Sequence, residues 1–139
     1  MKITINKYQD LSSDKLYEIL KLRSEVFVVE QNCAYQDLDN KDQKALHLIV
    51  EEKNKIIAYT RIFKKGDFFK NSSIGRVLVK KEHRRKDLGK KIMIKSIEQI
   101  KEDKNEKKIE LSAQKYLLKF YLELGFKKNG KEYLEDGIP

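Results

Sequence analysis

The chain has 139 residues, a net charge of +9 and one cysteine, Cys33. This length suits one domain, residues 1–139, around a single hydrophobic core, and one cysteine excludes an internal disulfide. The hydrophobic content of 40% excludes a disordered chain, and no apolar run reaches membrane-spanning length. The N-terminus lacks the apolar core of a secretion signal, which favours a reducing, cytoplasmic setting. The positive charge favours an anionic partner: nucleic acid, an acidic membrane surface or a phosphorylated small molecule.

The first part of the chain predicts a strand followed by a helix. Residues 2–8 alternate apolar and polar side chains, as a short strand does. Ser12 or Ser13 can cap an amphipathic helix. Arg23 lies on the apolar stripe of that helix, so its guanidinium needs a partner, and a structural ion pair is expected. The apolar positions of the stripe are Leu16, Ile19, Leu20 and Phe27.

The middle of the chain predicts a long loop and three strands. Residues 30–43 have no clean period and are rich in Asn and Asp, which is typical of a loop. Residues 46–51 and 55–63 are two strands of a predicted hairpin joined at Lys53-Asn54. Residues 73–80 are almost continuously apolar, which predicts a central strand covered on both faces.

The last part predicts a helix over 87–102, a strand over 107–114, a helix over 115–124 that ends at Gly125, and a closing hairpin over 126–135. A helix between two strands favours parallel pairing of those strands in one sheet. The predicted fold class is therefore a mixed α/β domain, a central sheet flanked by helices.

The segment from Val77 to Lys90 is a candidate anion site. A buried strand leads through a short basic loop into a helix, whose first N–H groups and positive dipole end attract anions. Gly89 would let a phosphate approach the backbone closely. Arg84, Arg85, Lys86 and Lys90 add positive charge, which suits a ligand with several phosphates. A solvated basic surface is the competing interpretation.

Two motifs resemble those of the GNAT superfamily of N-acetyltransferases. RRKDLGK is similar to the cofactor loop R-G-x-G-x-G/A, with Arg84 at its first position and Gly89 at its last; Asp87 replaces the middle glycine. AQKYLLKFYLELGF resembles the later segment N-x-x-A-x-x-l-Y-e-x-x-G-F, with Gln114 in place of the asparagine. Nearly the whole chain is similar to the ElaA-like subgroup, through LRSEVFVVEQNCAYQDLDNKD, ALHLIV, IGRVLV, LSAQ and EYLEDGIP.

The resemblance implies a V-shaped opening between the parallel strands at 73–80 and 107–114 that binds acetyl-CoA, with no metal. Pantetheine would hydrogen-bond the backbone of the first strand and the amide of Gln114. The phosphates would lie on the loop and the start of the helix. The cofactor-binding residues expected on this basis are Val77, Leu78, Val79, Arg84, Arg85, Lys86, Asp87, Leu88, Gly89, Lys90 and Gln114.

The implied reaction is direct attack of a primary amine on the acetyl carbonyl in a ternary complex. The backbone N–H near Leu78 or Val79 would stabilise the developing oxyanion. Tyr121 would protonate the departing thiolate, because it matches the family's tyrosine. Without that match, a core tyrosine on an amphipathic helix would be the simpler interpretation.

The group that accepts the proton of the amine stays open. Glu30, Glu51, Glu110, His47 and Asp136 all qualify, although a histidine in an apolar strand is more often a core residue. The acceptor-site candidates are Glu30, Arg76 and His47. Glu30 and Arg76 each require a partner; they could pair with each other, or one could face the acceptor. The acidic run of Asp37, Asp39 and Asp42 could attract a cationic amine, although a solvated loop is the simpler expectation.

Two other functions compete with acetyl transfer. The net charge and the basic clusters at 80–91 and 101–108 suit a nucleic-acid-binding module, but no recognised binding motif accompanies them. Asp87 in place of glycine suits an acyl-CoA-binding regulator without turnover. The preferred prediction remains an enzyme whose partner is a small-molecule or peptide amine, with no membrane partner, with nucleic acid disfavoured, and with a homodimer compatible with the sequence.

Overall fold

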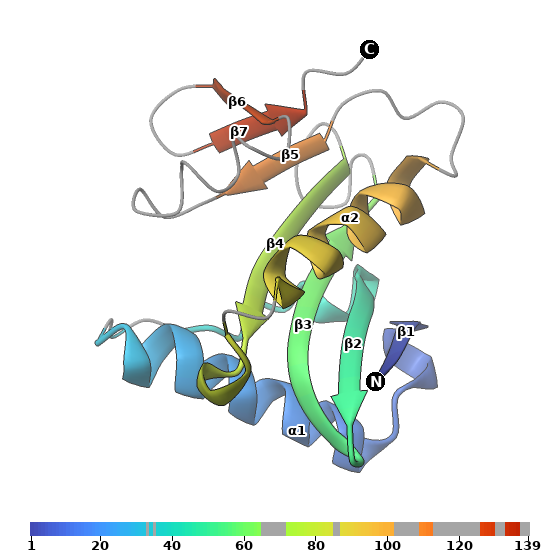
Figure 1. Ribbon diagram of the computed structural model, residues 1–139, viewed down its shortest axis with the longest axis vertical. Coiled ribbons are helices and arrows are strands. Elements are labelled where there is room, and N and C mark those ends of the chain that lie inside the picture. Colours follow the sequence, from blue (N-terminus) through green and yellow to red (C-terminus); the bar gives the residue numbers. More distant parts are fainter. Residues whose placement is uncertain are drawn as a thin grey trace.

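The computed structural model describes residues 1–32, 34, 36–64, 72–84, 87–101, 109–112, 126–129 and 133–136. Within these residues, seven strands form one sheet in the order β1-β2-β3-β4-β5-β7-β6 (Figure 1). The strands are β1 (Lys2–Lys7), β2 (Leu46–Glu52), β3 (Lys55–Phe63), β4 (Ser72–Val79), β5 (Ile109–Ser112), β6 (Phe126–Asn129) and β7 (Tyr133–Asp136). The mixed α/β fold and the central position of β4 are confirmed.

The described helices are two α-helices and several shorter turns. They are α1 (Ser13–Arg23), the π-helix η2 (Ser24–Glu30), α2 (Leu88–Lys101), and the 3-10 turns η1 (Tyr8–Asp10), η3 (Asp42–Lys44) and η4 (Lys81–His83). None of the helices in the described part of the chain is long and apolar enough to cross a membrane. The helix predicted over 115–124 lies outside the described residues.

The first helix starts as predicted but changes its winding. The Ser12 hydroxyl accepts a hydrogen bond from the Lys15 N–H at 3.1 Å, which caps α1. At Ser24 the N–H contacts the carbonyls of both Leu20 and Lys21, and the chain continues as a π-helix. Because of the wider winding, Val26 is buried on the core face while Phe27 packs at its margin. The sequence prediction of one regular helix through Phe27 is therefore corrected.

The predicted strand pairings are confirmed. β1 to β4 are antiparallel neighbours in chain order, and the β2–β3 hairpin turns at Lys53 and Asn54, whose φ angles of 53° and 64° are typical of a type I′ turn. α2 connects β4 to β5, and these two strands are parallel. β6 and β7 form the antiparallel closing hairpin.

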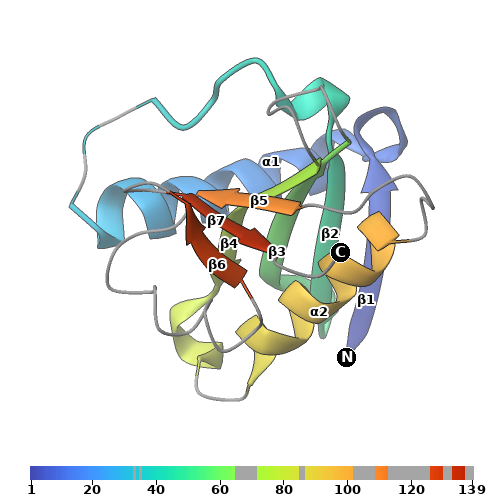
Figure 2. The same ribbon diagram turned by 90° about the horizontal axis from the view of Figure 1, so that it is seen from above.

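The two faces of the sheet carry separate apolar clusters. The cluster under α2 includes Leu48, Ala58, Ile62, Ile74, Ile92 and Met93, and the cluster under α1 includes Ile19, Leu22, Ile49, Tyr59 and Leu78. Seen from above, α1 and α2 lie on opposite faces of the sheet (Figure 2). The burial of Leu88, Ile92, Met93 and Ile100 confirms the predicted inward face of α2.

β4 and β5 pair over only part of their length, which creates the V-shaped opening. The pairing runs from Ser72 with Ile109 to Ile74 with Leu111, whereas β4 continues to Val79. A β-bulge interrupts the β3–β4 register opposite Thr60, and Arg76 in the bulge has a φ of 49°. A bulge bends its strand and increases the local twist. Beyond the bulge the two strands diverge (Figure 1).

Candidate functional site

The edge of β4 offers backbone groups to the opening. The Lys80 N–H donates to the Ile57 carbonyl of β3 at 2.7 Å, around the register pair of Ala58 and Val79. In an antiparallel ladder this makes Val79 a non-hydrogen-bonded residue, so its own N–H and carbonyl point away from β3. Those of Leu78 point toward β3 instead. Of the two N–H groups expected near the thioester, that of Leu78 is directed to β3, and that of Val79 is directed away from it.

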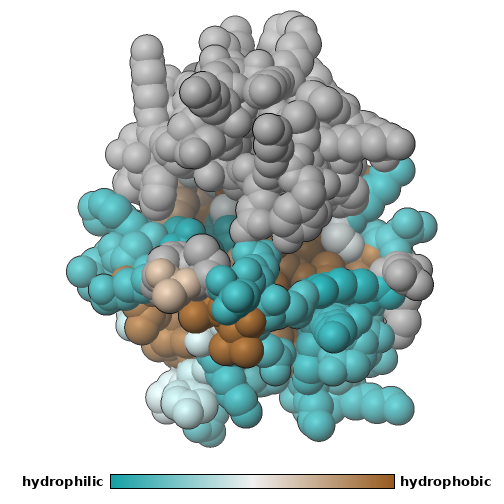
Figure 3. All heavy atoms as spheres, turned by 90° about the vertical axis from the view of Figure 1, so that its left-hand side faces the viewer, coloured by the Kyte–Doolittle hydropathy of each residue, from teal (hydrophilic) through white to brown (hydrophobic). Residues whose placement is uncertain are grey.

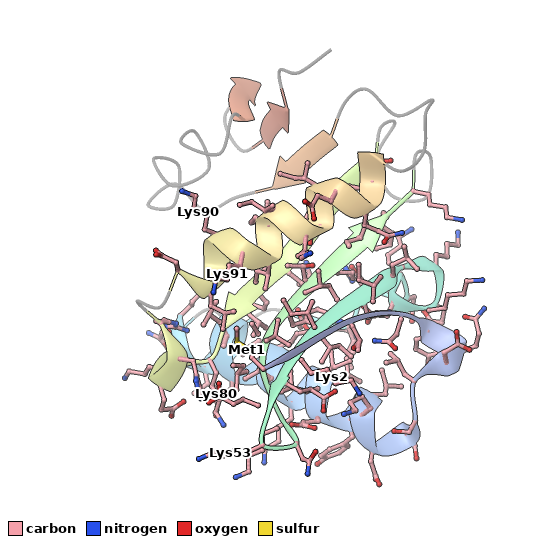
Figure 4. The ribbon with its side chains drawn as sticks, turned by 45° about the vertical axis from the view of Figure 1, so that its right-hand side comes forward. Met1, Lys2, Lys53, Lys80, Lys90 and Lys91 are labelled. Carbon is pink, nitrogen blue, oxygen red and sulfur yellow. The ribbon has the colours of Figure 1, made fainter. Side chains whose placement is uncertain are left out.

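The N-terminus of α2 lies directly after this strand. Its first intrahelical hydrogen bond runs from the Lys91 N–H to the Asp87 carbonyl at 3.1 Å, so the N–H groups of the three preceding residues have no acceptor within the helix. Leu88 is buried and fixes the start of the helix against the core. Lys90 and Lys91 project from the first turn, and Lys80 extends from the end of β4 on the same side (Figure 4). The arrangement suits a phosphate group.

Asp87 has a φ of 56°, in the left-handed region that favours glycine. The conformation accounts for the glycine of the family motif at this position, since a residue with a side chain adopts it at a cost of about 1 kcal/mol. Asp is among the residues that tolerate it best. The backbone shape of the motif is thus retained in this chain, while the carboxylate adds a negative charge beside the helix N-terminus.

If the phosphates of coenzyme A bind at this helix N-terminus, as the sequence motif predicts, removing the charge of Asp87 should tighten coenzyme A binding. A negative charge near bound phosphates costs on the order of 1 kcal/mol, so we expect Asp87→Asn to lower the Kd about three- to tenfold, measured by isothermal titration calorimetry. Asp87→Gly should bind at least as tightly, because it also relieves the backbone. Asp14→Asn, on the first turn of α1, is the control for net charge and should have no effect. An unchanged Kd in both Asp87 variants would place the phosphates elsewhere.

The side chain of Arg84 connects this loop to η2. Its Nε donates to the Val79 carbonyl at 2.9 Å, and its two terminal nitrogens contact the Glu30 carboxylate, one of them at 3.0 Å. Glu30 therefore pairs with Arg84 and not with Arg76, as the sequence left open. The guanidinium fastens the loop to the end of η2 and occupies the Val79 carbonyl, which leaves the Val79 N–H as the polar group of that residue available to a ligand.

Three arginines and three aspartates form a second polar group, which we call the arginine–aspartate cluster: Arg23, Arg61, Arg76, Asp37, Asp39 and Asp42. Arg23 bonds Asp37 at 2.8 Å and Asp42 at 2.6 Å. Arg61 forms two bonds of 2.9 Å to Asp39 and one of 3.1 Å to Asp42. Arg76 bonds Asp37 at 2.7 Å. The structural ion pair predicted for Arg23 is confirmed.

The acidic run is not a solvated loop, which corrects the simpler sequence expectation. Asp37 and Asp42 are buried, with exposures of 7% and 5%. Burial alone would raise the pKa of Asp39, but the hydrogen bonds and charge of Arg61, then the hydrogen bond from the Lys41 N–H and the charge of Arg76, outweigh it and lower that pKa. The loop resembles a solvated segment in composition, and only two arginines in apolar strands, the buried Arg61 and the half-buried Arg76, signal that its carboxylates have partners.

His47 is a core residue. It is fully buried, its Nε2 lies 2.9 Å from the Asp42 carbonyl, and its Nδ1 lies 2.5 Å from the Tyr59 hydroxyl. A carbonyl can only accept, so Nε2 carries the proton and Nδ1 accepts from Tyr59. Burial raises the pKa of Tyr59, which keeps that phenol protonated. Both ring nitrogens of His47 are occupied, so it is not available to take a proton from an amine.

The buried His47 should make the folded protein less stable as the pH drops. Burial lowers the pKa of this imidazole below its ordinary value, so the unfolded chain binds a proton below about pH 6.5 that the folded chain refuses. We expect the free energy of unfolding, measured in urea, to drop by up to about 1.4 kcal/mol per pH unit as the pH falls below about 6.5. His47→Gln should flatten this slope, while His83→Gln should preserve it. An equal slope in His47→Gln would contradict the assignment.

Some of the other candidate site residues lie in the described part of the chain, and others lie outside it. Glu51 bonds Lys15 at 2.5 Å on the β1 side of the sheet, away from the opening. Glu110 and Asp136 lie in β5 and β7, with Glu110 in register with Ser73 of β4. Arg85, Lys86, Gln114 and Tyr121 lie outside the described residues. Within the described part, no group of three or more His, Cys, Asp or Glu side chains could hold a metal ion.

Comparison with known proteins identifies a family for this arrangement. Residues 8–139 match the acetyltransferase (GNAT) domain. Protein ElaA of Escherichia coli is 39% identical over 134 residues, covering 95% of this chain and 88% of that protein. A relative in Schizosaccharomyces pombe is 40% identical with the same coverage.

Solved structures agree with the sequence relatives. The crystal structure of E. coli ElaA superposes with a TM-score of 0.85 at 32% identity over 96% of each chain. An acyl-CoA N-acyltransferase from Pseudomonas aeruginosa superposes with a TM-score of 0.91 at 28% identity, over 99% of this chain and 100% of that one.

Proposed function

The chain belongs to the GNAT family of acetyltransferases, and we propose that it transfers the acetyl group of acetyl-CoA to a primary amine by direct attack in a ternary complex. The observation that carries this proposal is the opening between β4 and β5, with the Val79 backbone directed into it and the N-terminus of α2 beside it. The structural similarity to an acyl-CoA N-acyltransferase from P. aeruginosa supports it.

The proposed cofactor lies along the free edge of β4. The pantetheine amides bond the backbone of Val77, with Gln114 as a further donor or acceptor, and the Val79 N–H is left for the thioester carbonyl. The pyrophosphate lies on the first N–H groups of α2, over Leu88 and Gly89, and the lysine side chains at positions 80, 86, 90 and 91 neutralise its charge. Apolar side chains are exposed among hydrophilic ones on the side of the molecule that carries η2 and this loop (Figure 3), which favours an amphipathic ligand.

The proposed reaction needs no covalent enzyme intermediate. The amine lone pair attacks the thioester carbonyl carbon, the C–S bond breaks, and the acetyl group moves to nitrogen. The Val79 N–H stabilises the negative charge that develops on the carbonyl oxygen. Tyr121 gives its proton to the departing thiolate, and the proton lost by the amine leaves through a base or through water. The acceptor is a small molecule or a peptide with a free primary amine.

Thermal unfolding with acetyl-CoA, coenzyme A or no ligand tests the cofactor part of the proposal. A ligand at a hundred times its Kd stabilises the folded state by about 2.7 kcal/mol, so both coenzymes should raise Tm at millimolar concentration. ATP, which has phosphates but no pantetheine, is the control and should raise it less. No shift with acetyl-CoA would refute the proposal. A shift with random duplex DNA that disappears in high salt would favour the nucleic-acid-binding alternative.

Release of free thiol from acetyl-CoA tests the chemistry. A panel of primary amines, including phenethylamine, spermidine, lysine and amino-acid amides, should contain at least one that accelerates thiol release above hydrolysis, and mass spectrometry should find the product heavier by one acetyl group. Cofactor binding with no turnover on any amine would instead support an acyl-CoA-binding regulator.

A further inference from the structure

The loop that follows η2 is fixed by arginines from three different elements. Arg23 lies at the end of α1, Arg61 in β3 and Arg76 in β4, and each bonds a carboxylate of residues 37–42. Arg23 and Arg76 also donate to the Asp37 backbone carbonyl, at 3.3 Å and 2.9 Å. Asp37 is therefore held by both its carboxylate and its backbone. A segment without regular structure thus acquires one defined conformation.

Net stability is a weak reason for such an arrangement. Arg23 and Arg61 are almost fully buried, and the cost of removing charges from water cancels much of the attraction within a buried ion pair. What buried ion pairs supply reliably is geometry, because planar guanidinium and carboxylate groups meet in few orientations. The Arg61–Asp39 pair is bidentate. The cluster is better suited to fixing the position of the loop than to stabilising the fold.

The arginine–aspartate cluster holds the loop beside the opening between β4 and β5. Arg76 lies in the bulge of β4, two residues beyond Ile74, where the β4–β5 pairing ends. Its guanidinium bonds Asp37 and lies 3.5 Å from Asp39, so residues 37–39 lie beside the point where the strands diverge. Asp37 and Asp39 also bond Arg23 and Arg61, respectively, and these two arginines lie on the face of the sheet that carries α1. The proposed cofactor enters beside α2 on the other face, which leaves the α1 face for the acceptor.

We propose that the Asp37–Arg76 pair holds residues 37–39 as a preformed wall of the acceptor site, and that Arg76 is a positioning residue for the amine. This inference rests on the proposed acetyl transfer. The carboxylates of the wall are engaged by guanidinium groups, so the acceptor is bound by the shape of the wall and not by an ion pair with its aspartates. Arg76 retains 22% side-chain exposure, the highest of the three arginines in the cluster, in keeping with its place at the edge of the opening.

The test compares Arg76→Gln with Arg76→Lys. Glutamine removes the charge and the paired donors, so we expect KM for the active amine of the panel to rise at least tenfold, with the Kd for coenzyme A changed less than threefold. Lysine restores the charge with one contact and should recover part of the loss. Lys44→Gln, an exposed residue of the same loop outside the cluster, is the control and should match the wild type. Equal losses in amine KM and coenzyme A affinity would overturn the inference.

Hydrogen exchange provides a readout that does not need an acceptor. Amide exchange of residues 36–44 should accelerate at least tenfold in Arg76→Gln, and that of β2 and β3 should stay unchanged. If the loop amides stay protected, Arg76 does not position the wall, whatever the kinetics. If the loop responds but no amine in the panel is acetylated by the wild type, the failure belongs to the proposed function.

Discussion

Replacing Arg23 by methionine should lower the free energy of unfolding by about 3–5 kcal/mol. Methionine keeps an unbranched side chain of similar length, but Asp37 and Asp42 lose the bonds of 2.8 Å and 2.6 Å that they receive from Arg23. Both carboxylates are buried, and a buried charge without its partner is far more costly than one exposed to water. Urea denaturation monitored by circular dichroism measures the change.

A matched control separates burial from charge. Lys15→Met, on the same helix, breaks an ion pair with Glu51 whose side chains are 30% and 15% exposed, and should cost about 1 kcal/mol or less. Adding Asp42→Asn to Arg23→Met should recover part of the loss, because it removes a buried charge that would keep only its Arg61 bond of 3.1 Å. Equal costs for Arg23→Met and Lys15→Met would mean that the cluster is not the buried network that its distances indicate.

The sequence predicted the sheet well because local patterns determine it. The continuous apolar run of β4, the alternation in β5 and the turn at Lys53-Asn54 each correspond to one strand or hairpin. The parallel pairing of β4 and β5 followed from the helix between them. The bulge at Arg76 could not be predicted, since a positive φ at a charged residue has no local signal.

The site was predicted less completely, because side-chain partners depend on tertiary contacts. The family motif located the loop from Arg84 to Gly89, and the left-handed backbone at Asp87 accounts for its glycine. Nothing in the motif indicated that Arg84 would bond Glu30, which lies 54 residues earlier in the chain. Likewise, the pairing of Asp37 with Arg76 spans 39 residues. Such contacts between distant residues emerge only from the folded chain.

Arg84 is one residue whose contacts differ from those that the motif suggested. Its position in the motif suggested a direct contact with phosphate, yet its guanidinium spans the Val79 carbonyl and the Glu30 carboxylate. The α1–η2 segment and the loop before α2 are thereby connected at the C-terminal end of β4, where β4 is no longer paired with β5. In the proposed function, the N–H groups of α2 and the neighbouring lysines bind the anion, and this part of the sequence prediction depends on backbone geometry and not on one side chain.

Replacing Tyr121 by phenylalanine should lower kcat by about a hundredfold to ten-thousandfold, the usual contribution of a general acid. Tyr121 matches the family tyrosine in the segment AQKYLLKFYLELGF, and phenylalanine keeps its ring while removing the only proton that it could donate. The Kd for coenzyme A should change little, since phenylalanine keeps the size and apolar character of the ring. Thiol release under saturating acetyl-CoA measures kcat, and calorimetry measures the Kd.

Tyr116→Phe, five residues earlier in the same segment, is the matched control, because it removes a phenol at a position outside the motif. A core tyrosine at 121 predicts the opposite pattern: both variants would lose stability by similar small amounts, and kcat would stay within a few-fold of the wild type. A general acid also predicts that an acyl donor with a more acidic thiol leaving group recovers much of the rate in Tyr121→Phe, because such a thiolate departs without a proton. Loss of kcat without that recovery would assign Tyr121 to cofactor alignment.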